Sequence, residues 1–305
     1  MRISTVTMFE QGVDSMNRQQ SDFLNVSKQI ASGRRVVTPS DDPQAASRAV
    51  VVDQSLAITQ QFADSRVSAR NSLGQAESVL NSVGDAITKA KTLLVQASND
   101  TLSDADRQSV ASELRGVYET IIGQANATDG NGRYLFGGFQ EDVPPFEKNN
   151  SGNIQYNGDS NVRKQRIDAS RLMPVADNGE TIFRHNAGGA ATDLFGTIEN
   201  ALEALENPGA ISFRDTINDS MRELDDSLDN VLTVRASMGA RLNELDVVDA
   251  VGNNRMMNYE QTLSDLVDLD YNEAISEYSL RQVGLQASQQ AFADIKGMSL
   301  FDFLR

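Results

Sequence analysis

The chain has 305 residues, which is enough for two domains or for one elongated molecule. Its 43 acidic residues outnumber its 27 basic ones, and the net charge of −16 argues against nucleic acid or an anionic membrane as a partner. There is no cysteine, which excludes disulfides, a thiolate nucleophile and cysteine metal sites.

The first segment, residues 1–45, carries apolar residues at alternating steps of three and four. This spacing places them along one face of a helix, and such a face needs a partner. Gln20 and Ser27 interrupt the stripe, which weakens it and can fix its register. A seam this thin cannot hold a lone helix, because burying one such side chain is worth about 1.5–3 kcal/mol and ordering each residue costs roughly 1–2 kcal/mol. We therefore predict an assembly segment that is disordered when free, with the apolar residues Val6, Phe9, Val13, Met16, Phe23 and Ile30.

Residues 46–133 are predicted to form the first half of a helical rod. Gly33 is typical of a helix C-cap, and Asp42 followed by Pro43 is typical of a helix start. From Pro43 to about Asn99 no proline interrupts the pattern, which predicts one helix of about 55 residues, roughly 80 Å long. Its apolar frame consists of Ala69, Leu73, Ala76, Leu80, Val83, Ile87, Ala90, Leu94 and Ala97.

A second helix is predicted to run antiparallel to this one. Turn-forming residues gather in residues 98–108, where Ser103 is a candidate cap and Asp104 and Asp106 occupy the first turn. The helix then continues to about Ala127 and completes a hairpin.

Residues 134–190 are predicted to be a small β-rich outer domain, because helical periodicity gives way to Gly, Asn, Pro and alternating residues. Ile154 and Tyr156 alternate with polar neighbours. Asn157 and Gly158 favour a two-residue hairpin turn, after which Val162 and Ile167 can supply a returning strand.

Residues 191–266 are predicted to be the second half of the rod. Helix resumes at about Asp193, and the sequence Asn-Pro-Gly-Ala at residues 207–210 breaks it. A long frame then runs from Ile217 to Leu266 and can pair with the first long helix. The frame slips at residues 268–274, where we place the junction with the last segment.

The last segment, residues 267–305, repeats the pattern of the first. Its stripe contains the apolar residues Ile275, Tyr278, Leu285 and Phe292, interrupted by Gln282 and Gln289. The fold expected is mainly α: an elongated helical hairpin or coiled-coil rod built from both chain halves, with a small β-rich insert at its outer end. The two terminal stripes either form an intramolecular coiled coil in a free-standing protein or carry packing between subunits.

No pattern of catalytic or ligand-binding residues stands out. His185 is the single histidine, and no phosphate-binding loop, nucleophile elbow or zinc motif occurs. The acidic clusters are explained by helix capping or by solvated helix faces. We therefore expect no enzymatic activity, cofactor or metal. The chain also lacks an apolar signal region and a run long enough to span a membrane, so we expect a soluble protein without a cleaved signal peptide.

Four segments resemble the flagellin superfamily. They are SGRRVVTPSDDPQAAS at residues 32–47, VQASNDTLSDADRQSVASEL at 95–114, DGNGRYLFGG at 129–138 and LQASQQAFADIKGMSLFDFL at 285–304. Within that superfamily, the opening MRISTVTMFEQ and the ending SLFDFL are more similar to the hook-associated proteins of the hook-filament junction than to filament flagellin.

The resemblance implies a structural subunit of the bacterial flagellum outside the cell. Such a subunit would be exported unfolded by the flagellar type III apparatus and would lie between the first hook-associated junction protein and flagellin, in a ring with copies of itself. A flagellar export chaperone would bind its C-terminal segment. Two alternatives stay open at this stage, namely a short filament flagellin and a cytoplasmic coiled-coil adaptor.

Overall fold

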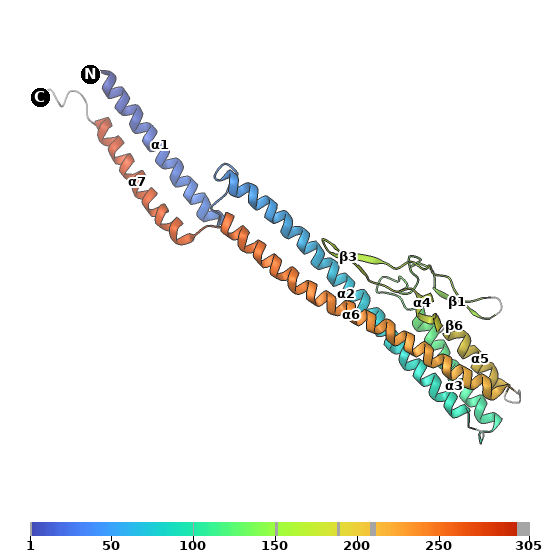
Figure 1. Ribbon diagram of the computed structural model, residues 1–305. Coiled ribbons are helices and arrows are strands. Elements are labelled where there is room, and N and C mark those ends of the chain that lie inside the picture. Colours follow the sequence, from blue (N-terminus) through green and yellow to red (C-terminus); the bar gives the residue numbers. More distant parts are fainter. Residues whose placement is uncertain (1, 100, 150–151, 188–189, 208–211, 298–305) are drawn as a thin grey trace. The chain divides into compact units, whose positions relative to one another are not determined.

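The computed structural model describes residues 2–99, 101–149, 152–187, 190–207 and 212–297 (Figure 1). The chain divides into two compact units. The terminal unit comprises Met1–Thr59 and Asn254–Arg305, and the central unit comprises Gln60–Asn253. Helices dominate both units and a small strand-containing insert interrupts the central one, which confirms the predicted mainly α fold with a β insert.

The terminal unit contains α1 (Arg2–Ser32), α7 (Tyr271–Gly297), the start of α2 (Pro43–Ala97) and the end of α6 (Phe213–Val267). Helix α1 ends where Gly33 takes a φ of 71°, and the Gly33 N–H donates to the carbonyl oxygen of Gln29 at 2.9 Å. Helix α2 starts at Pro43, with a carboxylate oxygen of Asp42 accepting from the Ala45 N–H at 3.0 Å. Both predicted caps are confirmed.

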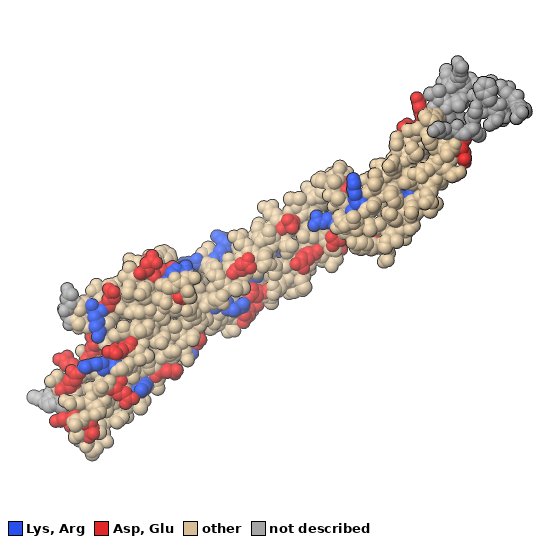
Figure 2. All heavy atoms as spheres, turned by 180° about the vertical axis from the view of Figure 1, so that it is seen from behind, with Lys and Arg blue, Asp and Glu red and all other residues tan. Residues whose placement is uncertain are grey.

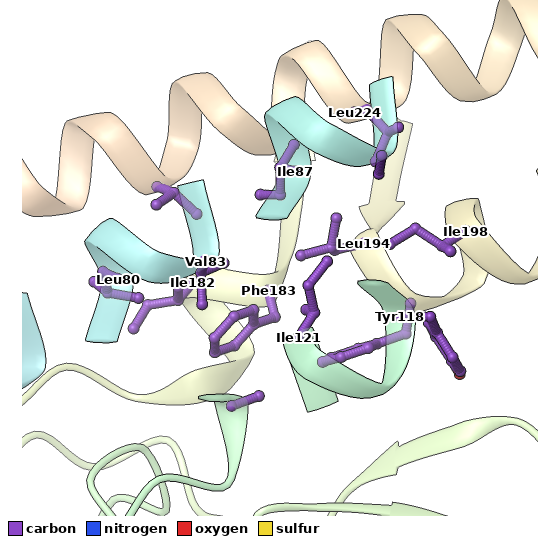
Figure 3. Packing of buried hydrophobic residues seen from close by; sticks show 14 of the residues in the cluster. Leu80, Val83, Ile87, Tyr118, Ile121, Ile182, Phe183, Leu194, Ile198 and Leu224 are labelled. Atoms are coloured by element: carbon purple, nitrogen blue, oxygen red, sulfur yellow. The ribbon is translucent and has the colours of Figure 1, made fainter. Parts of the chain in front are cut away.

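The central unit is built on the long helices α2 and α6, together with α3 (Asp104–Ala125), α4 (Gly179–Phe183) and α5 (Leu194–Glu206). Every residue of the apolar frame predicted for α2 is at least 96% buried. Side chains of the other helices converge on this frame (Figure 3). These include Tyr118 and Ile121 of α3, Ile182 and Phe183 of α4, Leu194 and Ile198 of α5, and Leu224 of α6.

The strands of the insert form three separate antiparallel pairs. Strand β1 (Phe146–Lys148) pairs with β2 (Ile154–Tyr156), β3 (Lys164–Asp168) with β4 (Arg171–Pro174), and β5 (Arg184–Ala187) with β6 (Ala190–Asp193). Asp193 then caps α5, where its carboxylate accepts from the Phe195 N–H at 3.1 Å. Part of the predicted breaker after α5 lies outside the described residues; its first residue, Asn207, is the C-cap of that helix.

The predicted hairpin at Asn157 and Gly158 is wrong. The Asn157 N–H donates to the Pro145 carbonyl at 2.8 Å and so extends the β1–β2 pair. Gly158 lies against the Tyr156 side chain, since a Cβ on Gly158 would be 2.5 Å from the Tyr156 ring. The strand pairing follows burial: Phe146 of β1 and Ile154 of β2 both enter the core, and the reversal between them uses Gly152 at a φ of 91°.

Helix α6 ends at Val267 and α7 begins at Tyr271, within the segment where the apolar frame slips. Across the described parts of the chain, none of the helices combines the length and the apolar character needed to cross a membrane.

Candidate assembly interface

Helices α1 and α7 lie side by side and antiparallel in the terminal unit (Figure 1). Two aromatic pairs join them: the ring centroids of Phe9 and Phe292 are 5.2 Å apart, and those of Phe23 and Tyr278 are 4.9 Å apart. The structure thus brings together residues that sequence analysis placed in two separate terminal stripes. Aromatic pairs at such distances are worth about 0.5–1.5 kcal/mol beyond the area that they bury.

The remaining predicted interface residues differ in exposure. Val13, Met16, Ile30 and Leu285 are half-buried, and Ile275 is 55% exposed. Val6 belongs to α1, but its side chain lies outside the described residues. Lys, Arg, Asp and Glu side chains are spread along the molecule on the face seen in Figure 2.

The polar positions of the α7 stripe were predicted incorrectly. Gln282 and Gln289 are exposed, as is Gln20 of α1. Arg281 makes a polar contact with α1 instead, since its guanidinium lies 2.9 Å from the Asp22 carboxylate; within α7 the same guanidinium lies 3.0 Å from the Glu277 carboxylate.

Small residues explain why the face of α7 that contacts α1 differs from the predicted stripe. The face consists of Ala274, Tyr278, Arg281, Leu285, Ser288 and Phe292. Beside it, Gly284 lies so close to α1 that a Cβ there would be 3.0 Å from the Gln19 side-chain oxygen. A stripe of apolar residues alone gives no weight to glycine, alanine or serine, although these residues allow close helix approach.

The loop between α1 and α2 is tied to the segment between α6 and α7. The Arg35 N–H donates to the Val267 carbonyl at 2.8 Å, the Leu269 N–H donates to the Gly33 carbonyl at 3.1 Å, and the Arg35 guanidinium donates to the Leu266 carbonyl at 2.7 Å. These bonds join the two points at which the chain enters and leaves the terminal helix pair. No single-segment pattern in the sequence signals them.

Asp41 and Asp42 stabilise this loop from the α2 side. A hydrogen bond from the Thr38 backbone lowers the pKa of Asp41, and a hydrogen bond from the Ala45 backbone, followed by one from Arg35, lowers the pKa of Asp42. Asp42 therefore caps α2, as predicted from the sequence, whereas Asp41 accepts from the Val37 and Thr38 N–H groups of the preceding loop and does not cap the helix.

Side chains suited to metal binding do not cluster anywhere in the described ranges of the chain. His185 lies in β5 opposite Thr192, and its side chain is outside the described residues.

Two family models match the chain. The bacterial flagellin N-terminal helical region matches residues 3–141, and the bacterial flagellin C-terminal helical region matches residues 221–304. The matched stretches include α1 and α7, so the candidate interface lies within the regions that the models cover.

Alignments with two similar proteins cover nearly the whole chain. Flagellar hook-associated protein 3 of Escherichia coli K12 is 40% identical and the alignment covers 99% of both chains; the Salmonella typhimurium LT2 protein of that name is 38% identical over all of both. The flagellin of Bacillus subtilis 168 is 25% identical, with 72% of this chain and 71% of the flagellin covered.

Solved structures share the fold. A putative flagellar hook-associated protein from Vibrio parahaemolyticus superposes with a TM-score of 0.70 at 24% identity, covering 75% of this chain and all of that one. Xanthomonas campestris FlgL superposes with a TM-score of 0.63 at 22% identity, covering 70% of this chain and 99% of that one.

Proposed function

The chain belongs to the flagellar hook-associated protein 3 family of the bacterial flagellins, and from this premise we propose that it is a structural subunit of the hook-filament junction. In this proposal it joins the hook-associated ring to the flagellin filament, and its terminal helices fold as they assemble. The identity of 40% over nearly the whole length carries the proposal.

The alternative of a short filament flagellin receives less support. The flagellins among the similar proteins are 21–26% identical to the chain, well below the values for the hook-associated proteins. If the chain were a filament flagellin, the purified protein would polymerise alone into long filaments. Failure to form them supports the junction role.

The thin packing of the terminal helices supports folding on assembly. Among the described side chains of α1 and α7, only Val26 and Ala274 are buried, at 5% exposure each. Phe9 remains 44% exposed despite its contact with Phe292. A pair with so little buried surface gains further stability only from additional chains.

The partners proposed are the first hook-associated junction protein, flagellin and copies of the chain in a ring. A flagellar export chaperone would hold the C-terminal segment before export through the type III apparatus, without a cleaved signal peptide. The role proposed is structural and not catalytic, since the family consists of structural flagellar proteins.

Replacing Phe23 or Leu285 with Asp tests the proposal. Either carboxylate would lie between α1 and α7, so we expect the central unit to keep its helical circular dichroism while filaments fail to attach to the hook. Gln282→Asp is the matched control, because Gln282 is exposed on the same helix. Normal swimming and retained filaments in the Phe23 and Leu285 variants would overturn the proposal.

Limited proteolysis of the purified chain tests folding on assembly without any reference to motility. We expect rapid trimming at both ends to a core of roughly residues 45–265. A cytoplasmic coiled-coil adaptor, the alternative from another class, would resist proteolysis at both ends.

A further inference from the structure

Helix α7 carries a second apolar stripe that does not contact α1. Leu280 and Val283 are 70% and 63% exposed, and Ala287 continues the stripe. Tyr278 and Leu285, which face α1, lie on the other side of the helix. Since α1 already occupies that other side, this chain cannot use α1 to cover the second stripe.

The second stripe has heptad spacing of its own. Glu273, Leu280, Ala287 and Asp294 follow one another at intervals of seven residues, and Val283 follows Leu280 by three. Such spacing suits packing along another helix. The charged members, Glu273 and Asp294, are both acidic and both exposed.

A complementary stripe lies on the first part of α2. Val51 and Ile58 are seven residues apart and are 61% and 44% exposed, and Val50 beside them is 68% exposed. Arg48, three residues before Val51, is the charged member of this stripe and is also exposed. The α2 stripe is thus apolar with a basic end, whereas the second stripe of α7 is apolar with acidic ends.

A groove beside Val50 extends the apolar surface of α2. It has a volume of about 350 Å³ and lies between the start of α2, the loop before it and the end of α6. Its lining is mixed: Val37, Ala49, Val50 and Leu263 are apolar, and Arg34, Asp53 and Asp268 are charged. Exposed apolar surface with a polar rim is typical of sites of protein association.

We infer that the second stripe of α7 in one copy packs along the α2 stripe of the next copy, with Leu280 and Val283 against Val51 and Ile58. The inference rests on the proposed function, since it names the surfaces by which copies meet in the ring. The two stripes are different surfaces of one chain, so the contact is head-to-tail and propagates from copy to copy. The charges at the ends of the stripes favour pairing with α2, because pairing the second stripes of two α7 helices would bring acidic residues together.

Engineered cysteines test this contact, since the chain has none of its own. Flagella would be isolated from cells making the full chain with Val51→Cys, with Val283→Cys or with both, and then mildly oxidised. A head-to-tail contact predicts a ladder of cross-linked multimers for the double variant and monomers for each single variant. A double variant in which Val247→Cys replaces Val51→Cys is the control, because Val247 is 65% exposed on α6 and should give no ladder.

The outcomes separate the inference from the proposed function. Dimers from Val283→Cys alone, or a double variant that is incorporated but stays monomeric, would overturn the contact and leave the junction role intact. Absence of the chain from isolated hook-filament junctions would overturn the junction role itself. In a second arm, Glu273→Arg should reduce cross-linking and Arg48→Glu in the same chain should restore it; cross-linking that ignores both changes would count against the inferred pairing.

Discussion

Arg66 is a completely buried cation in the central unit. Its side chain is 1% exposed and pairs through Nε with the Asp249 carboxylate of α6, while Nη1 donates to the Ile167 carbonyl of β3 at 3.0 Å. Gly252 makes the space, since a Cβ there would lie 2.5 Å from Nη2 of Arg66. One side chain of α2 therefore connects α6 to the insert.

Substituting Gly252 tests how closely this arrangement is packed. Gly252→Ala should destabilise the central unit by about 1–3 kcal/mol, because the methyl group would displace a buried guanidinium from its partners. Gly239→Ala is the control: nothing lies within 4 Å of its added Cβ, so better helix propensity should stabilise the protein by up to about 1 kcal/mol. Urea unfolding measures both, and changes of the same sign would contradict the packing argument.

Asp249 makes the same cluster sensitive to acid. Burial opposes its ionisation, but hydrogen bonds from Arg66 and Arg70 outweigh burial and lower the pKa of Asp249 below its usual value of 3.8. A lowered pKa in the folded state gives stability that is complete above about pH 4 and is lost as the pH falls through the folded-state pKa.

Acid unfolding of Asp249→Asn checks this sign. The variant should be less stable than the native chain near pH 7, and the difference should shrink as the pH falls below 3.8. Asp246→Asn removes an exposed partner of Arg70 while the Arg66–Asp249 pair stays in place, so it controls for the loss of one charge. A difference that grows toward acid would show that the linkage has the opposite sign.

At the scale of elements, the helices could be predicted and the strand pairing could not. The α2 frame repeats over many turns, and one continuous partner surface buries all of it, so local pattern and tertiary packing agree. The Asn157 and Gly158 pair satisfies a local rule for tight turns, but the burial of Phe146 and Ile154, which precede this pair in the chain, decides the register.

The interface between α1 and α7 was likewise predictable only where its residues form a local periodic pattern. Phe23 and Tyr278 are large and their spacing is periodic, so they mark the facing sides of α1 and α7. The Arg281–Asp22 ion pair and the close approach at Gly284 depend on which small residues the partner helix meets. That information lies in two segments more than 250 residues apart and in no single periodicity.

Helix α3 starts at a capping box whose contribution can be measured. The Ser103 hydroxyl accepts from the Asp106 N–H at 3.3 Å, and the Asp106 carboxylate accepts from the Ser103 N–H at 3.1 Å. Ser103→Ala should cost about 1 kcal/mol, measured by urea unfolding. Ser109→Ala, further along the exposed side of α3, should change stability by less than about 0.5 kcal/mol, and an equal loss in both variants would contradict the capping role.

At the scale of the whole molecule, the two units have very different cores. The buried apolar residues described in the terminal unit are Val26, Val36, Ala45 and Ala274. The central unit buries a continuous cluster that includes several leucines, isoleucines and phenylalanines. Because buried apolar area is the dominant favourable contribution to folding, the terminal unit should open at lower free energy.

Because the terminal helices are proposed to fold only on assembly, calorimetry of the unassembled chain should show one transition, that of the central unit. Leu80 is fully buried in the central core, so Leu80→Ala should lower the stability seen in this transition by about 2–5 kcal/mol. Phe23→Ala removes only the contact with Tyr278 in the terminal unit and should leave the transition unchanged. A transition that Phe23→Ala also shifts, or a second transition that it alone moves, would mean that the terminal helices are already folded before any neighbouring subunit arrives.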